Sequence, residues 1–260
     1  MDQPLVEERF RGIDRLYGAG SVARLAQAHV GVVGIGGVGS WAVEALARSG
    51  VGRLTLIDAD EVCVGNVNRQ LHALDGEFGR AKVAVMAERA RAINPRIAVE
   101  PIEEFLTPSN LPRLLDRGYD VVVDCCDAFR VKVEAIAWCR RRKRALITCG
   151  SAGGRTDPTL IAVRDLAKTE HDALLALVRK KLREEFGFPR GPKRYFGVQA
   201  VYSRENVRYP QPDGRVCGVR PPAGAALKLD CGAGLGAATH VTAAFGFAAV
   251  SRVLAKLLAA

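Results

Sequence analysis

Short apolar runs alternate with longer amphipathic stretches through roughly the first 150 residues of the chain. Continuous apolar runs are typical of strands buried on both faces of a parallel sheet, and apolar residues spaced three or four apart indicate helices. Strands are predicted in this way at residues 30–33, 54–57, 97–102, 119–124 and 145–149. Because helical patterns separate these runs, the sequence predicts an α/β fold with a doubly wound, mostly parallel, Rossmann-like sheet and right-handed crossovers.

Several helix boundaries are marked by their residues. Before the first strand, residues 4–27 predict two short helices, with Ser21 as the N-cap of the second. The helix between the second and third strands is predicted to stop before Pro95. The next helix is predicted to be capped by Thr107, with Pro108 at its first position.

The second half of the chain is less regular and predicts an irregular α+β elaboration. The elements expected there are a strand at residues 160–163, a helix at 172–186, a strand at 198–203, an irregular stretch at 204–228 and a final helix from Gly232 to about Leu258. Residues 232–251 carry no formal charge and are long enough to span a bilayer. Their Gly, Ala and Thr content gives a weak drive for insertion. We therefore predict a closely packed core or interface helix, with membrane association as the alternative.

A glycine-rich turn joins the first strand to the first long helix. Its glycines are Gly34, Gly36, Gly37 and Gly39. Such a turn lets the backbone approach a phosphate, and the following helix N-terminus offers free N–H groups. Asp58 follows the second strand about 20 residues on, where an acid accepts hydrogen bonds from ribose hydroxyls. The pattern predicts a nucleotide site without saying which nucleotide, and a tight turn without a ligand is the alternative.

Two more acids follow the strand at residues 119–124, namely Asp124 and Asp127. Ligands of doubly wound sheets bind at the carboxyl ends of the strands, so both acids are site candidates. An acid at this position can instead be a helix N-cap, and that alternative stays open for Asp127.

The chain carries a formal net charge of +10 and has a pI near 9.5. This excess favours a polyanionic partner, with nucleic acid ahead of a membrane surface, although solubility alone could explain part of it. Basic stretches at residues 140–144, 179–183 and 190–194 are candidates for phosphate contacts or simply solvated faces. The candidates for stacking on an RNA base are Tyr195, Phe196 and Tyr202.

The seven cysteines form no C-x-x-C pair, which argues against a structural zinc ribbon. An odd number of cysteines without an apolar leader is typical of reduced thiols, so a cytoplasmic location is expected. Cys231, just before the final helix, is either a transient thioester nucleophile or a small buried residue.

The segment Asn66-Val67-Asn68-Arg69-Gln70, with Lys82 and Asp127 after a glycine-rich turn, resembles the ubiquitin-activating-enzyme-like adenylyltransferases of the ThiF, MoeB and HesA type. That resemblance implies ATP binding and adenylation of a carboxylate. Further segments resemble one branch, the tRNA threonylcarbamoyladenosine dehydratases; these are residues 150–154, 165–169, 209–211 and 230–250. The branch implies ATP-dependent cyclisation of threonylcarbamoyladenosine at position 37 of ANN-decoding tRNAs, through an acyl-adenylate that releases pyrophosphate and then AMP.

The resemblance also implies roles for the cations. ATP brings about four negative charges, which a site without strong cations would bind poorly. Arg69 and Lys82 would face the phosphates, and Arg15 would reach in from the partner subunit of a homodimer, with Arg9 as its competitor. Arginine suits bidentate phosphate contacts, whereas lysine acts as a point charge.

Polar and acidic residues complete the implied site. Asn68 and Gln70 would orient phosphate oxygens, Asp58 and Asp60 would hold the ribose, and Asp127 would hold Mg²⁺. A monovalent cation, K⁺ or Na⁺, and a cysteine desulfurase or sulfur-acceptor system are further partners that the resemblance leaves open.

Three regions follow from these expectations: N-terminal helices over residues 1–28, a nucleotide-binding domain over 29–155, and a region for substrate, tRNA and dimerisation over 156–260 that continues the same sheet.

Three other functions stay open. One is adenylation of the C-terminus of a ubiquitin-like sulfur carrier. The second is an NAD-dependent oxidoreductase, which would have no use for Arg69, Lys82 or Asp127. The third is a non-catalytic nucleic-acid-binding module.

Overall fold

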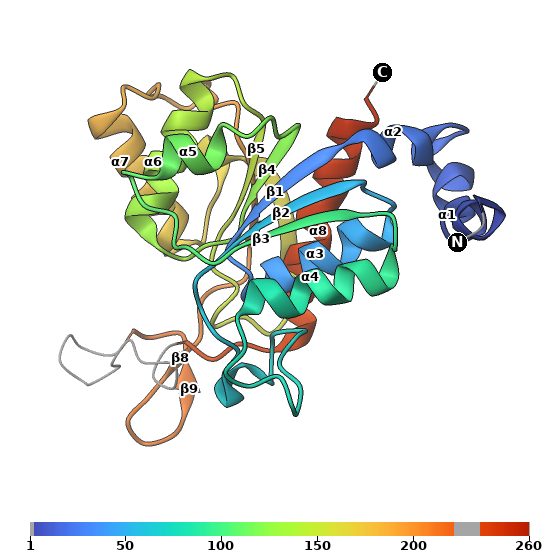
Figure 1. The fold of residues 1–260 in the computed structure, drawn as a ribbon. Helices are drawn as coiled ribbons and strands as arrows, with labels where there is room; N and C mark the ends of the chain where they lie inside the picture. The colour runs from blue at the N-terminus through green and yellow to red at the C-terminus, as the bar shows by residue number, and fades with distance from the viewer. Residues whose placement is uncertain (1–2, 221–234, 260) are drawn as a thin grey trace.

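The computed structural model describes residues 3–220 and 235–259 (Figure 1). Seven strands form one sheet in the order β3-β2-β1-β4-β5-β7-β6. All neighbours are parallel except β6 and β7. The strands are β1 (His29–Val33), β2 (Arg53–Ile57), β3 (Ala98–Ile102), β4 (Val121–Asp124), β5 (Leu146–Cys149), β6 (Ile161–Asp165) and β7 (Gln199–Ser203). The predicted doubly wound, mostly parallel sheet is confirmed.

Helices cover both faces of this sheet. Those described are α1 (Gln3–Tyr17), α2 (Ser21–Gln27), α3 (Gly39–Arg48), α4 (Lys82–Ile93), α5 (Leu111–Leu115), α6 (Phe129–Arg141), α7 (Ala173–Glu185) and α8 (Thr239–Leu257), with 3-10 turns η1 (Val64–Asn66), η2 (Pro158–Leu160) and η3 (Leu166–Lys168). Helices α3, α4 and α8 pack on one face, and α5, α6 and α7 pack on the other (Figure 1).

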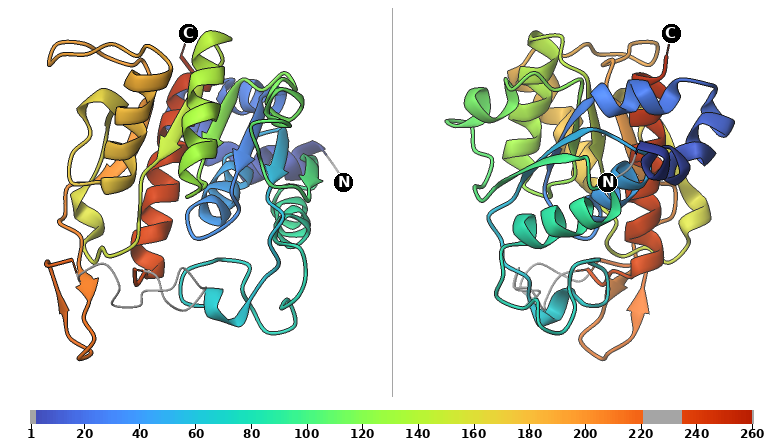
Figure 2. Two further views of the ribbon diagram at one scale, coloured as in Figure 1. Left: turned by 90° about the vertical axis from the view of Figure 1, so that its left-hand side faces the viewer. Right: turned by 45° about the vertical axis from the view of Figure 1, so that its right-hand side comes forward.

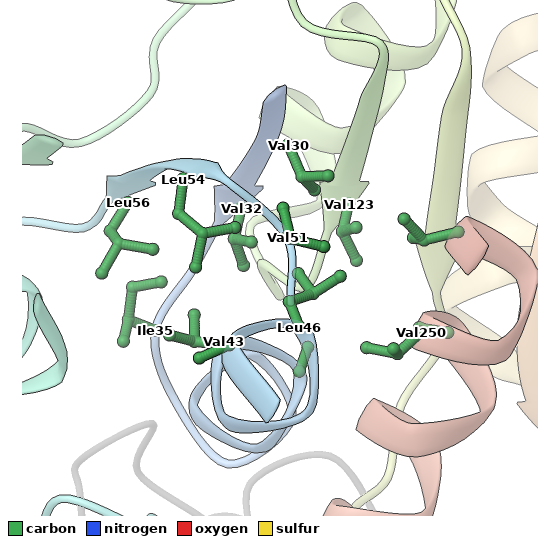
Figure 3. Packing of buried hydrophobic residues seen from close by; sticks show 14 of the residues in the cluster. Val30, Val32, Ile35, Val43, Leu46, Val51, Leu54, Leu56, Val123 and Val250 are labelled. Carbon is green, nitrogen blue, oxygen red and sulfur yellow. The ribbon is translucent and has the colours of Figure 1, made fainter. Parts of the chain in front are cut away.

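Alternate residues of the central strands face the two helical layers. On β1, Val30 and Val32 face α3 and α8, whereas Val33 faces the layer of α5, α6 and α7. Figure 3 shows the first of these layers, in which strand side chains meet Leu46 of α3 and Val250 of α8. Because both faces of β1 are buried, its sequence is a continuous apolar run rather than an alternating one.

The last helix, α8, is a closely packed core element. A Cβ atom at Gly246 would lie 2.7 Å from the carbonyl oxygen of Val38, so the α8 backbone runs directly against the start of α3. The helix begins at Thr239, later than the predicted start after Gly232. The reason is that the Gly236 carbonyl accepts a hydrogen bond from Gly154 and stays outside the helix. Across the two described ranges, we find no helix whose length and apolarity would let it cross a membrane.

Two predicted helix starts were wrong. Helix α5 begins at Leu111 rather than at Pro108, because Thr107 and Asn110 exchange side chain to backbone hydrogen bonds of 2.7 and 3.3 Å in a preceding turn. Helix α2 takes Gly20 as its N-cap, with Ser21 as the first helical residue. In both cases a neighbouring side chain satisfies the backbone in a way that the local sequence did not reveal.

The stretch predicted to be irregular over residues 204–228 contains a small hairpin. Its strands are β8 (Tyr209–Pro210) and β9 (Val216–Cys217), which pair antiparallel. The hairpin projects beyond the carboxyl edge of the main sheet (Figures 1 and 2).

Candidate active site

The carboxyl ends of four parallel strands meet at one edge of the sheet. Val33 of β1 is in register with Ile57 of β2 and with Asp124 of β4, and Asp124 is in register with Thr148 of β5. The loops after β1, β2 and β4 therefore gather at this edge, below the sheet in Figure 1. They bring most of the predicted site residues together.

The glycine turn after β1 is held in a conformation that two of its glycines require. Gly34 has φ +82°, and a Cβ there would lie 2.9 Å from the amide nitrogen of Cys126. A Cβ at Gly39 would lie 1.8 Å from the carbonyl oxygen of Gly34. Gly36 and Gly37 are less crowded, with nearest atoms at 3.8 and 3.2 Å. Helix α3 starts at Gly39 without a side-chain cap, which leaves its N-terminus suited to an anion.

Asp58 ties the end of β2 to the glycine turn. It is 8% exposed, and its Oδ2 accepts the N–H of Ile35 at 2.6 Å while its Oδ1 accepts the N–H of Asp60 at 2.9 Å. Each carboxylate oxygen has two lone pairs, so capacity for a ribose hydroxyl remains. The acid therefore shapes the turn in addition to any contact with a ligand.

Lys82, the first residue of α4, is buried beside this turn. Its side chain is 7% exposed, and Nζ donates to Oδ2 of Asp60 at 2.7 Å. Asp60 is about half exposed, so the pair lies at the boundary between protein and solvent. A buried ammonium with a single half-exposed carboxylate partner is suited to a second anion.

The loop at residues 64–70 is anchored through its backbone. The Arg69 carbonyl accepts hydrogen bonds from Nε1 of Trp41 and Oγ1 of Thr242, both at 3.2 Å. The Arg69 guanidinium donates to Oδ1 of Asn68 at 2.9 Å, and Nδ2 of Asn68 donates to the Ala237 carbonyl at 2.7 Å. Helices α3 and α8 thus hold the backbone of this loop, while the Arg69 side chain stays at the surface of the site.

Gln70 and His72 lie just behind the glycine turn. Gln70 is buried, and its Oε1 has no hydrogen-bond partner among the described residues. His72 is also buried, and its Nε2 donates to the Ile35 carbonyl at 2.8 Å. Burial lowers the pKa of His72, which favours the neutral form of the ring. Sequence reasoning missed His72, because a single histidine in a polar loop carries no spacing signal.

Asp124 is not available to a ligand, so the prediction that it is a candidate site residue was wrong. Its Oδ2 accepts hydrogen bonds from Nζ of Lys132 at 2.6 Å and from Oγ1 of Thr148 at 2.7 Å. Lys132 is fully buried. Burial alone would lower the pKa of Lys132, but the charge of Asp124 raises it above its ordinary value. The pair is a buried structural ion pair at the end of β4, and no local pattern indicated that Lys132 would face inward.

Asp127, three residues further on, has a different environment. It is exposed, and its carboxylate has no hydrogen bond or ion pair with the described residues. The N-cap of α6 is Ala128, so the alternative that Asp127 caps this helix was wrong. The described residues contain no cluster of three or more metal-ligating side chains. A divalent ion at Asp127 would therefore need phosphate and water oxygens for its other ligands.

Arg15 and Arg9 lie far from the other candidates within one chain. Phe10 packs against Gly50, which lies between α3 and the amino end of β2, so α1 sits at the opposite edge of the sheet from the glycine turn (Figures 1 and 2). Nη1 of Arg9 donates to the Ile93 carbonyl at the end of α4, at 3.0 Å. Arg15 is exposed. Cys231, the other predicted catalytic candidate, lies outside the described residues.

Two of the three predicted stacking residues were wrong. Tyr202 is fully buried and Phe196 is 2% exposed, because both point into the core below α6 and α7. Tyr195 is 65% exposed, with Nζ of Lys168 lying 4.7 Å from its ring centroid. Of the basic stretches, residues 140–144 are exposed.

The stretch at residues 179–183 is partly neutralised. Nζ of Lys181 lies 2.7 Å from a carboxylate oxygen of Glu185, and Nζ of Lys180 lies 3.9 Å from one of Glu184. These pairs follow the spacing of a solvated helix face. The two lysines therefore favour the solvated-face alternative over a phosphate-binding face.

Comparison with known proteins gives a consistent picture. The model of the ThiF family matches residues 11–258. A protein of Escherichia coli (strain K12) named tRNA threonylcarbamoyladenosine dehydratase is 51% identical over 252 residues, which cover 97% of this chain and 94% of that protein. A crystal structure of the Escherichia coli dehydratase TcdA in complex with ATP superposes with a TM-score of 0.86 at 48% identity, covering 96% of this chain and 94% of that one. Its complex with AMP gives a TM-score of 0.85 at 49% identity, with the same coverage.

Proposed function

The chain belongs to the ThiF family, and on that premise we propose that it is an ATP-dependent enzyme that cyclises the threonylcarbamoyl side chain of threonylcarbamoyladenosine in tRNA. The observation that carries the proposal is the gathering of Arg69, Lys82 and Asp127 around a glycine turn. An oxidoreductase would have no use for these three groups. Support for the substrate comes from the 51% identity, over nearly the whole chain, to a protein of that name.

The site fits ATP as the second substrate. The glycine turn brings its backbone to the uncapped N-terminus of α3, where a phosphate can bind, and a Cβ at Gly34 or Gly39 would clash with the backbone and disrupt this turn. Lys82 and Arg69 would neutralise the triphosphate, and the Nε2 amide group of Gln70 would donate to a phosphate oxygen. Asp58 and Asp60 would receive the ribose hydroxyls. A relative that is about half identical binds ATP in its crystal structure.

Mg²⁺ fits the exposed carboxylate of Asp127, which lies in the loop after β4, next in sequence to Cys126, whose backbone is against Gly34. When bound there, the ion would supply positive charge to the phosphate oxygens. The cations of the chain itself, Arg69 and Lys82, would stabilise the charge that develops on the phosphoryl group during attack.

The reaction would proceed in two steps. In the first, an oxygen of the threonyl carboxylate attacks the α-phosphorus of ATP, the bond to the bridging oxygen breaks, and pyrophosphate leaves. In the second, the neighbouring carbamoyl group attacks the activated carbonyl, loses its proton and expels AMP, which keeps the carboxylate oxygen. The nucleoside loses one water overall. Because the second step is intramolecular, proximity can accelerate it without a protein nucleophile, and a thioester at Cys231 stays a hypothesis.

We further propose a homodimer in which Arg15 of one subunit serves the site of the other. Its support is that Arg15 is exposed and belongs to α1, a helix that lies at the opposite edge of the sheet from its own chain's glycine turn. Because the proposed substrate is tRNA, we propose a cytoplasmic location. Binding of a K⁺ or Na⁺ ion and interaction with a sulfur-transfer system also remain proposals.

Nucleoside mass spectrometry tests the proposed function. The chain is incubated with ATP and tRNA that carries threonylcarbamoyladenosine, and the digest is examined for a nucleoside that has lost one water. Lys82→Ala should abolish both this product and pyrophosphate release, because the variant removes the buried cation of the site. Lys180→Ala, at an exposed position of α7, should leave both unchanged. Pyrophosphate release with a ubiquitin-like carrier protein, and none with the tRNA, would refute the proposal.

A further inference from the structure

A second hollow lies at the same edge of the sheet, away from the glycine turn. It has a volume of about 490 Å³ and is formed between the first half of α7 and the segment that follows β7. The side chains that matter to the inference are His171, Asp172, Arg179, Asn206 and Tyr209. In Figure 2, α7 and the β8–β9 hairpin that borders this segment lie on the same side of the molecule.

Helix α7 is docked directly onto the carboxyl end of β5. Oδ2 of Asp172 accepts the N–H of Ser151 at 2.8 Å, and a Cβ at Gly150 would lie 2.1 Å from that oxygen. Strand β5 is two strands away from β1, a separation of about 10 Å across the sheet. The hollow and the glycine turn therefore lie at the same edge of the sheet, with β4 between the strands that carry them.

The hollow contains a guanidinium that forms no ion pair with the described residues. Arg179 is half-buried, and its one described hydrogen bond goes to the Thr169 hydroxyl. Burial, followed by the nearby charge of Arg183, lowers the pKa of Arg179, and the charge of Asp172 only partly opposes this. Partial desolvation of a cation that forms no direct ion pair is costly, so an anion bound against Arg179 would relieve this cost.

A second guanidinium supports the wall of the hollow. Arg155 is 2% exposed, and it donates to two backbone carbonyls, those of Glu205 and His171. Its Nε has no hydrogen-bond partner among the described residues. Neither Arg155 nor Arg179 forms an ion pair with the described residues, although the charge of Asp172 acts on both, whereas the lysines on the outer face of α7 are paired with glutamates.

Hydrogen-bonding and aromatic groups line the rest of the hollow. Nδ1 of His171 lies 2.9 Å from Oδ1 of Asn206. His171 has φ +54°, a left-handed conformation that is uncommon for a residue other than glycine. The hydrogen bond from Arg155 to its carbonyl holds that conformation. Tyr209 is half-buried and leaves part of its ring open to the hollow.

We propose that this hollow binds the modified nucleotide of the tRNA, with Arg179 on a backbone phosphate and the ring of Tyr209 against the base. The inference rests on the proposed function and deepens it. An unpaired guanidinium, groups that can bond to base edges and an aromatic face are the combination that reads single-stranded RNA loops. The threonylcarbamoyl side chain would then extend along the sheet edge to the glycine turn.

Binding of the anticodon stem–loop that carries threonylcarbamoyladenosine tests the proposal. Fluorescence anisotropy of a labelled stem–loop, measured over a range of salt concentrations, should show that Arg179→Gln weakens binding about tenfold. The slope of log affinity against log salt should fall by about 0.7 to 0.9, because one phosphate contact is lost. Arg179→Lys should keep most of the slope. Tyr209→Ala should weaken binding by a similar factor without changing the slope, whereas Tyr209→Phe should bind normally.

Lys180→Ala is the matched control, because this residue lies on the same helix in an ion pair with Glu184. ATP affinity and melting temperature should stay at the wild-type value in every variant. Equal affinities and slopes for Arg179→Gln and Lys180→Ala would overturn the proposal, as would a loss of ATP affinity equal to the loss of RNA affinity. Failure of the proposed function is a different result: the unaltered chain would then produce no dehydrated nucleoside at all.

Discussion

Two buried charged or polar residues show how single positions set the stability of this protein. Lys132 is completely enclosed, and its partners Asp124 and Thr148 come from the ends of two neighbouring strands. The ion pair joins β4, β5 and α6 immediately behind the loop that carries Asp127. Because neither charge reaches solvent, each depends on the other.

Removing one member of this pair should be much more harmful than removing both. Lys132→Met leaves the Asp124 carboxylate buried without a counter-charge, and we expect a loss of about 3 to 5 kcal/mol in the free energy of unfolding. Urea unfolding followed by circular dichroism measures it. The double variant with Asp124→Asn should recover much of the loss. If Lys132→Met lowers the free energy of unfolding by less than about 1 kcal/mol, the Asp124 carboxylate does not depend on Lys132 as described.

His29 makes stability depend on pH. Its ring is buried, lies 2.9 Å from Oγ1 of Thr55 through Nε2, and packs edge-on against Tyr119. Burial, followed by the charge of Arg53, lowers the pKa of His29 to about 4. Its protonated form is thus favoured in the unfolded chain, which has the ordinary value near 6.5.

Stability should therefore fall as the pH is lowered from about 6.5 to about 4, by up to roughly 3 kcal/mol from this residue. The measurement is the free energy of unfolding in urea across that range. His29→Gln, which cannot be protonated, should flatten the dependence in this window. An unchanged pH profile in the variant would assign the acid sensitivity to other groups.

At the scale of elements, the contact between α8 and α3 controls the shape of the nucleotide site. Gly246 of α8 faces Val38, which belongs to the glycine turn, and Thr242 one turn earlier bonds to the Arg69 carbonyl. A helix near the end of the chain thus holds two loops from the first third of the chain. The geometry of these two loops depends on how closely α8 can approach α3.

Gly246→Ala should weaken both stability and ATP binding. The new methyl group would lie 2.7 Å from the Val38 carbonyl oxygen. Overpacking of this kind costs about 1 to 3 kcal/mol. Thermal unfolding and a titration with ATP measure the two effects. Gly12→Ala in α1, where a Cβ meets nothing within 4 Å, is the control and should be neutral or slightly stabilising. Unchanged ATP affinity in Gly246→Ala would show that the contact between α8 and α3 does not control the nucleotide site.

At the scale of the whole molecule, the position of Arg15 makes the proposed dimer testable. Arg15 belongs to α1, at the amino edge of the sheet, whereas Lys82 begins α4 after the loop at the carboxyl edge (Figure 1). If each site takes Arg15 from the partner, a mixed dimer of two different inactive variants contains one site with both residues intact. Homodimers of either variant contain none.

Arg15→Ala and Lys82→Ala should each be inactive alone, and co-expression of the two should restore about a quarter of the wild-type activity. Random pairing gives half mixed dimers, each with one intact site. The assay is formation of the dehydrated nucleoside, with subunit composition checked by mass spectrometry under native conditions. Mixed dimers that form but remain inactive would show that Arg15 acts within its own subunit or has no role in the reaction.

The sequence by itself determined the sheet and the identity of most groups at its carboxyl edge. The apolar runs of β1 and β4 can be buried only between two helical layers, and the glycine turn allows a few backbone conformations. Only the tertiary structure decided which charged groups face inward. Asp124 and Asp127 follow the same strand pattern in the sequence. In the structure, Asp124 is paired with Lys132, whereas Asp127 is exposed to solvent. Tyr202 and Phe196 likewise turned out to be core residues. Local patterns record backbone preference and burial, whereas the pairing of polar groups depends on contacts between residues distant in the chain.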